Sequence, residues 1–183
     1  MTWEFALERR TEIAATASEL PMDSEAFTGF YERSARPLWA YLVRVSGNPA
    51  LSEDLMQESF VRFLCAAHRC EGEVEARRYL FRIATNLLRD YWRRPVATSI
   101  EELPEGFFAS NQGASDISSE AILGQAMTKI KPRDRQLLWL AHAEGYSHRE
   151  IAEVMGLGAA SVRLLLFRAR RKLAGALQSG GAA

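Results

Sequence analysis

Apolar side chains recur at helical spacing along almost the whole chain, and no stretch keeps the alternation of β-branched residues that is typical of strands. The clearest pattern begins at Ala76, where apolar residues follow the spacing i, i+4, i+7, i+8, i+11, i+12 and i+15. The residues of this stripe are Ala76, Leu80, Ile83, Ala84, Leu87, Leu88 and Tyr91. The pattern predicts an all-α protein and a helix whose stripe faces a core.

Two more helices are expected before this one. The stretch from Ser24 onward is strongly apolar at helical spacing, and Pro37 is expected to interrupt or kink it. Residues 46–49 are predicted to form a turn, and Ser52 is a candidate N-cap for the next helix. Residues 71–73 are then expected to break the chain before the helix that carries the stripe.

The C-terminal part has the pattern of a helix-turn-helix. Ser147 and Glu150 have the spacing of a capping box, in which each side chain satisfies a backbone N–H at the start of a helix. Gly156 is expected to end that short helix, and a second helix is expected from about Ala159 or Ala160. The inward stripe of the second helix consists of Val162, Leu166, Ala169 and Leu173. Several outward residues near it are basic.

The segment between these two parts differs in composition. Residues 96–119 contain Pro104, Gly106 and Gly113, few aliphatic residues and only negative charge, which is typical of a linker without its own core. We therefore expect two small helical domains joined by a flexible acidic linker. The expected boundaries are 1–21 for an N-terminal extension that could be helical, 22–95 for the first domain, 96–119 for the linker, 120–178 for the helix-turn-helix domain and 179–183 for a loose tail.

The zero formal net charge of the 183 residues hides an uneven distribution. Residues 96–120 hold five acidic residues and no lysine or arginine, whereas residues 129–172 hold ten basic and four acidic residues. The second helix of the helix-turn-helix can therefore bind DNA although the whole chain is neutral. The candidate DNA contacts around this helix are Arg149, Ser161, Arg163, Leu164, Phe167, Arg168 and Arg171.

Several other classes of protein are disfavoured. No apolar run is long enough for a membrane span, and the acidic residues among the first twenty argue against a secretory signal. The two cysteines do not have the pattern of a disulfide framework, so a cytoplasmic protein is expected. An enzyme is the least favoured class, because the histidines are scattered and no phosphate-binding glycine loop or nucleophile with a base is visible. We therefore expect no cofactor and no small-molecule substrate.

A metal site needs separate consideration. Cys65, His68 and Cys70 lie within six residues and could hold zinc, but no fourth ligand is nearby. The interpretation that we favour is a buried Cys65 at a helix end, with the other two as bystanders.

Two motifs in a fixed order resemble the extracytoplasmic-function (group 4) sigma factors of RNA polymerase. The first is the acidic-Gln-Glu-x-Phe helix around residues 53–60, and the second runs from Tyr79 to Arg94 ahead of the helix-turn-helix. The resemblance implies a region 2-like bundle and a region 4-like helix-turn-helix domain. It also implies that the first motif binds the clamp helices of the largest polymerase subunit. The implied polymerase contacts are Asp54, Gln57, Glu58 and Phe60.

The same resemblance implies that the second motif melts the -10 promoter element while the helix-turn-helix recognises the -35 element. Tyr79 and Trp92 would offer stacking surfaces to an unpaired base, whereas Tyr91 is expected in the core. The implied -10 contacts are Arg77, Arg78, Tyr79, Arg82, Asn86, Arg89, Trp92, Arg93 and Arg94. The polymerase flap, promoter DNA and an anti-sigma factor are the other implied partners.

This chain departs from the family pattern on the surfaces that should face DNA. Residues 70–75 are strongly acidic, and Leu164 and Leu165 stand where a polar residue and an arginine are usual. These leucines could contact thymine methyl groups or a protein partner. Two alternative functions remain, a stand-alone helix-turn-helix regulator and a degenerate sigma-like scaffold. Binding to core polymerase separates the sigma factor from the stand-alone regulator.

Overall fold

The computed structural model describes residues 23–66, 70–93 and 116–180, and these parts are helical, with no strand among them. The helices are α2 (Ser24–Ser46), α3 (Pro49–Cys65), α4 (Glu73–Arg93), α5 (Asp116–Thr128), α6 (Pro132–His142), α7 (His148–Met155) and α8 (Ala159–Gly180). The all-α prediction is confirmed. The N-terminal extension, His68, Arg94 and residues 96–115 of the expected linker lie outside the described residues.

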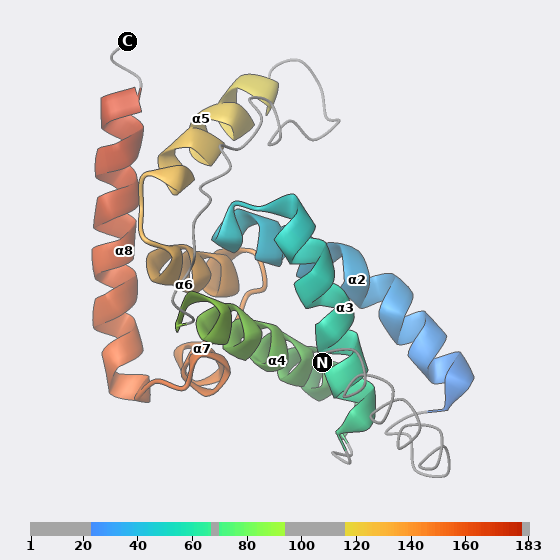
Figure 1. The fold of residues 1–183 in the computed structure, drawn as a ribbon. Coiled ribbons are helices and arrows are strands. Elements are labelled where there is room, and N and C mark those ends of the chain that lie inside the picture. Colours follow the sequence, from blue (N-terminus) through green and yellow to red (C-terminus); the bar gives the residue numbers. More distant parts are fainter. Residues whose placement is uncertain (1–22, 67–69, 94–115, 181–183) are drawn as a thin grey trace.

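Helices α2, α3 and α4 pack into the first bundle (Figure 1). The turn between α2 and α3 is as predicted, with Gly47 in the left-handed region at φ 75°. The N-cap of α3, however, is Asn48, whose side chain accepts from the Leu51 N–H at 3.0 Å, and Pro49 stands at the first helical position. Ser52 is instead fully buried, and its hydroxyl donates to the Asn48 carbonyl at 2.7 Å.

Pro37 was expected to interrupt or kink this helix, and it does not interrupt it, because α2 continues through this residue to Ser46. Leu38, Tyr41 and Leu42 follow Pro37 directly and are fully buried. Packing of these side chains therefore outweighs the loss of one backbone hydrogen bond at the proline.

Helix α4 buries more of its surface than the predicted stripe. It begins at Glu73, three residues earlier than expected, and Glu73 and Glu75 lie in its first turn, where negative charge is favourable. Phe81 is fully buried although it lies off the stripe. Tyr91 was expected in the core, and this prediction is wrong, because the residue lies near the end of α4 with 37% of its surface exposed.

Helices α5 to α8 form the second domain, in which α7 and α8 make the predicted helix-turn-helix. The capping box is present: the Glu150 N–H donates to Ser147 Oγ at 3.3 Å, and the Ser147 N–H donates to Glu150 Oε2 at 2.8 Å. Gly156 ends α7 at φ 63°. Helix α8 continues to Gly180, so the start of the expected loose tail is helical.

The two domains are packed against each other. Helix α7 lies along α4, and α6 lies against α2 (Figure 1). One cluster of buried apolar residues runs through both domains, from Phe30 and Leu80 in the first to Leu140 and Ile151 in the second. The sequence predicted two domains but not this shared core.

Arg135 in α6 adds polar contacts between the domains. Its guanidinium donates to the Thr128 carbonyl at 2.9 Å and to the Ile130 carbonyl at 3.1 Å, and it reaches the Val45 carbonyl at the end of α2 at 3.3 Å. Burial lowers the pKa of Arg135, but its nitrogens are satisfied by these carbonyl oxygens. Nothing in the sequence pattern distinguished Arg135 from its basic neighbours.

Candidate nucleic-acid interface

The residues predicted to contact polymerase lie on α3 and divide into two groups. Asp54 and Gln57 are exposed, and Glu58 is half-buried and pairs with Arg62 one turn later at 2.7 Å. Phe60 is 5% exposed and packs edge-on against Phe30, with 6.4 Å between ring centroids. Phe60 therefore holds α3 in the bundle, and the prediction that it lies on the binding face is corrected.

The outward face of α8 carries the residues predicted to contact the -35 element. Leu164 and Phe167 are 51% and 57% exposed, which is unusual for large apolar side chains. The Arg171 guanidinium lies over the Phe167 ring at 6.0 Å. The other exposed residues of this face are Ser161, Arg163 and Arg168, and Arg149 is exposed at the start of α7.

The two unusual leucines of α8 point in different directions. Leu164 faces outward, whereas Leu165 is half-buried and packs against the shared core. Only Leu164 is therefore placed to meet DNA or another molecule. Helical spacing explains this difference. Leu165 lies one turn after Val162 and next to Leu166, which both belong to the inward stripe, whereas Leu164 lies on the opposite side of the helix.

The outward face of α4 carries most of the residues predicted to contact the -10 element. Arg82 lies over the Tyr79 ring at 5.3 Å, and Tyr79 packs against Phe63. Arg89 donates to Asn86 Oδ1 at 2.6 Å. Trp92 is 37% exposed, and Arg93 is exposed. This face therefore carries polar and basic side chains between two aromatic ones, which suits single-stranded DNA.

Arg77 and Arg78 are not part of this open face. Arg77 donates from Nη2 and Nε to Glu144 Oε2 at 2.7 and 3.1 Å, and the Glu144 side chain is only 4% exposed. Arg78 hydrogen bonds to Glu150 and lies 3.8 Å from Glu153. All three carboxylates belong to the helix-turn-helix domain, so the structure joins these two predicted DNA contacts to protein.

Two groups at this contact, Glu150 and Tyr146, have shifted pKa values. The Ser147 backbone N–H and hydroxyl hold the pKa of Glu150 below its usual range, and the Arg78 guanidinium adds to this effect. Burial raises the pKa of Tyr146 to about 12, with the Glu144 carboxylate acting in the same direction. Glu150 is therefore ionised and Tyr146 neutral at physiological pH.

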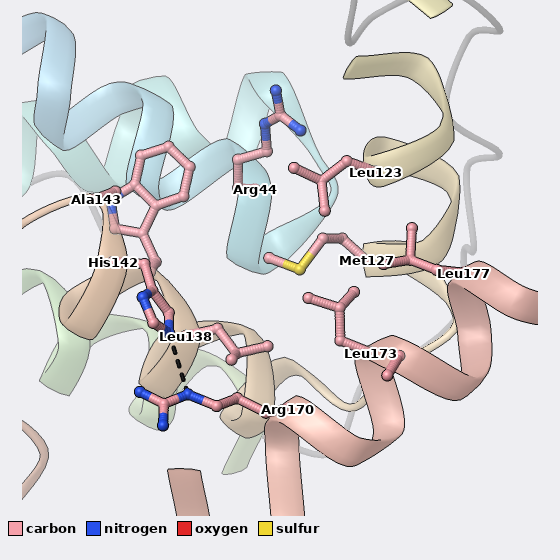
Figure 2. A pocket seen from close by; sticks show the side chains of 11 residues that line it. Arg44, Leu123, Met127, Leu138, His142, Ala143, Arg170, Leu173 and Leu177 are labelled. Atoms are coloured by element: carbon pink, nitrogen blue, oxygen red, sulfur yellow. Dashed lines mark hydrogen bonds between the residues drawn. The ribbon is translucent and has the colours of Figure 1, made fainter. Parts of the chain in front are cut away.

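An apolar pocket of about 500 Å³ lies between α5, α6 and α8 (Figure 2). Leu123, Met127 and Leu138 point into it from α5 and α6, and Leu173 and Leu177 from α8. Its edge is basic: Arg44 approaches from α2, and Arg170 donates to His142 at 3.3 Å. The sequence stripe placed Leu173 inward, but the pocket itself was not foreseen.

The cysteines are placed differently from the sequence interpretation. Cys65 was expected to be buried at the end of its helix, but it is exposed, and Cys70 is half-buried. Burial raises the pKa of the Cys70 thiol, which disfavours the thiolate. No cluster of three ligands for a metal is found within the described residues, from which His68 is missing.

Comparison with known proteins gives the same two domains. The family model of Sigma-70 region 2 matches residues 30–96, and that of Sigma-70 region 4 matches residues 120–173. The ECF RNA polymerase sigma factor SigE of Mycolicibacterium smegmatis is 30% identical over 85% of this chain and 68% of its own length. This chain belongs to the ECF RNA polymerase sigma factors. It is thus a transcription initiation factor that works with RNA polymerase and promoter DNA.

Other relatives of this sigma factor support the same family assignment. RNA polymerase sigma factor CarQ of Myxococcus xanthus is 28% identical over 81% of this chain and 87% of its own length. The sigma factor RpoE of Bartonella quintana, solved in complex with the anti-sigma factor NepR, has the same fold, with a TM-score of 0.71 at 19% identity. That comparison covers 84% of this chain and 98% of RpoE. In the described parts of this sigma factor, no helix is long and apolar enough to cross a membrane.

Proposed function

We propose that this sigma factor recognises the -35 element with the outward face of α8 and the -10 element with the outward face of α4. The observation that carries the proposal is the exposed group of Arg163, Leu164, Phe167 and Arg168 at the start of the second helix of a helix-turn-helix. In such domains this part of the helix enters the major groove. The arginines can bind guanine edges or phosphates, and the apolar side chains can contact thymine methyl groups.

The polymerase contact is proposed on α3. Asp54 and Gln57 are exposed on one side of this helix, while Leu55 and Phe60 fix the other side in the bundle. An exposed acidic and amide surface on a rigid helix suits a basic partner surface. We assign this face to the clamp helices of the largest polymerase subunit.

Run-off transcription tests both DNA contacts. Purified core polymerase and this protein are given the DNA upstream of the protein's own gene, and a discrete transcript that depends on the protein is expected. Asn86→Ala and Arg163→Ala should each lower its yield by about tenfold, because one good base contact contributes about 1–3 kcal/mol. Arg36→Ala is the matched control, since Arg36 is exposed on α2 and lies on neither proposed face.

Two outcomes would change the proposal. Normal transcription by Arg163→Ala would remove α8 from recognition of the -35 element. Failure of the wild-type protein to bind core polymerase in a pull-down would reject the proposed polymerase contact on α3. Asp54→Ala with Gln57→Ala should reduce that binding while leaving the helical circular dichroism unchanged.

The pocket between α5, α6 and α8 is proposed as the second polymerase contact. Its apolar lining and basic edge suit an apolar helix that carries acidic residues, and we assign it to the polymerase flap. Leu123 is 41% exposed at its mouth, so Leu123→Asp can enter without burying the new charge. This variant should weaken polymerase binding, whereas Ile122→Asp, at a comparably exposed neighbouring position that does not line the pocket, should not.

An anti-sigma factor is also proposed as a partner, in the cytoplasm, where polymerase works. RpoE of Bartonella quintana, which shares the fold, was solved with such an inhibitor. Because the two domains of this chain pack against each other, one inhibitor can contact surfaces of both. Co-purification from the native cell, followed by identification of the bound proteins, tests this proposal.

A further inference from the structure

The contact between α4 and the helix-turn-helix domain covers residues that the proposed function assigns to DNA. Arg77 and Arg78 stand at the start of the -10 face, and Glu144, Glu150 and Glu153 meet them from the loop before α7 and from α7 itself. A carboxylate presents to a guanidinium the same kind of anionic oxygen acceptors as a phosphate. The same two arginines cannot bind both at once.

The contact is more than a pair of surface ion pairs. The Glu144 side chain is 4% exposed, and its other oxygen accepts from Trp139 Nε1 at 3.3 Å, so its position is fixed within its own domain. The Arg77 and Arg78 side chains are 31% and 27% exposed. Ion pairs that are withdrawn from water in this way couple more strongly than exposed pairs.

Apolar packing supports the same arrangement. The Phe81 ring of α4 meets the Tyr146 ring edge-on, with 6.2 Å between centroids, directly beside the ion pairs. The Arg77 guanidinium lies 5.6 Å from the centroid of Phe81. Gly156 brings the end of α7 close to Arg89, since a Cβ built there would lie 3.5 Å from Arg89 Nη1. The closed contact therefore extends along α4 from Arg77 to Arg89, which is about three turns of the helix.

The outward face of α8 does not take part in this contact. Leu164 and Phe167 remain exposed, and Arg163 and Arg168 remain exposed beside them. Closure thus covers part of the -10 face and leaves the proposed -35 face open.

We propose that the helix-turn-helix domain inhibits this sigma factor from within, with Glu144, Glu150 and Glu153 holding Arg77 and Arg78 in place of the phosphates of the melted -10 strand. The proposal rests on the assignment of α4 to the -10 element. It names a regulation of that site which needs no second protein. Opening separates α7 from α4 and frees both arginines, and core polymerase favours the open state if it holds the two domains apart.

Removal of two carboxylates tests the contact without touching the proposed DNA residues. E144Q/E153Q keeps the size of both side chains and an acceptor for Trp139, but it removes the negative charges that face Arg77 and Arg78. Glu150 is left in place, because it also caps α7. E25Q/E32Q is the matched control, since it makes the same change in net charge at exposed positions of α2.

The first readout is the affinity of the full-length protein for a short, fluorescein-labelled thymidine oligonucleotide, measured by anisotropy at low salt. Contacts to phosphate do not depend on sequence, so this probe suffices. E144Q/E153Q should bind about tenfold more tightly than the wild type, because the apparent affinity rises with the open fraction. E25Q/E32Q should stay close to the wild type, and adding R77A/R78A to E144Q/E153Q should remove the gain.

The second readout is the radius of gyration from small-angle X-ray scattering, which should increase in E144Q/E153Q and not in the control. An unchanged radius, or an oligonucleotide affinity equal to that of the wild type, would overturn the proposal. Transcription with saturating core polymerase should be the same for wild type and variant, because polymerase has already opened the protein. If neither the wild type nor E144Q/E153Q binds core polymerase, the result would instead contradict the proposed function.

Discussion

At the scale of single residues, the hydroxyl pair of Tyr41 and Thr85 is a buried polar contact between α2 and α4. The two oxygens are 2.7 Å apart, and both residues are almost fully buried. Burial raises the pKa of Tyr41 above its usual range, so the phenol is neutral at physiological pH. A neutral pair of this kind stabilises the bundle only while both partners are present.

Tyr41→Phe should lower the free energy of unfolding by about 1–3 kcal/mol, because the Thr85 hydroxyl is left without its buried partner. Thr85→Val should have a similar effect for the same reason. The double variant should lose less than the sum of the two, since no unsatisfied hydroxyl remains. Urea unfolding of the wild type, the two single variants and the double variant measures these differences. Strictly additive losses of unfolding free energy would show that the two hydroxyls do not interact.

The lowered pKa of Glu150 predicts that the stability of the protein depends on pH. Its pKa is lower in the folded state than the usual value of 4.5, so its stabilising contribution is complete above that value and is lost as the pH falls through the folded-state pKa. Glu150→Gln should therefore make unfolding less sensitive to acid. Urea unfolding at neutral pH and below the folded-state pKa measures the difference, and equal acid sensitivity in both proteins would contradict this assignment.

Periodicity predicted burial well at some single residues and failed at others. Val162 and Leu166 are buried and Leu164 is exposed, as the spacing along one helix requires. Tyr91 lies on the predicted stripe but beyond the part of α4 that its neighbours cover. Phe81 lies off the stripe and is buried because it packs against Tyr41 of α2 and Tyr146 of the second domain, contacts that no pattern within α4 can reveal.

At the scale of helices, the ends of a helix could be predicted where the sequence carried a clear capping residue. Ser147 and Glu150 predicted the start of α7, and Gly156 predicted its end. The start of α3 was misplaced because two candidate caps, Asn48 and Ser52, stand four residues apart, and proline at the first position favours the earlier one. Pro37 does not interrupt α2, because the tertiary packing of this helix outweighs the local preference of proline.

Gly156→Ala should destabilise the protein by about 1 kcal/mol, because alanine at φ 63° is strained in the left-handed region. Crowding adds little, since the nearest atom to the new Cβ is Arg89 Nη1 at 3.5 Å. Gly175→Ala is the matched control: it lies inside α8 in open space, so alanine should stabilise that helix. Thermal unfolding of both variants should therefore shift in opposite directions.

At the scale of the whole molecule, the shared core holds the two domains together in the closed state. Buried apolar residues continue from the first bundle into the helix-turn-helix, and Arg135 ties α6 to the end of α2. The sequence predicted each domain and the linker between them. It could not predict their contact, because the charges that meet there are far apart in the chain and each alone is typical of a solvated helix face.

Arg77 and Arg82 should differ when each is replaced by alanine. Arg82 is exposed, so Arg82→Ala removes a proposed DNA contact and leaves the contact between the domains unchanged. Arg77→Ala removes a proposed DNA contact but also weakens the closed state, and these two effects on DNA affinity oppose each other. Affinity for the thymidine oligonucleotide should therefore fall less for Arg77→Ala than for Arg82→Ala. A larger loss for Arg77→Ala would indicate that closure does not compete with DNA.

The exposed position of Leu164 and Phe167 has a consequence for how a promoter is found. In the proposed closed state, the molecule presents to duplex DNA the helix proposed to read the major groove, while the carboxylates of the second domain hold two of the arginines proposed to bind an unwound strand. Such a molecule can survey long stretches of intact duplex and leave each wrong site without opening it. Commitment to unwinding is then delayed until polymerase is present, which keeps stray melting of the genome rare.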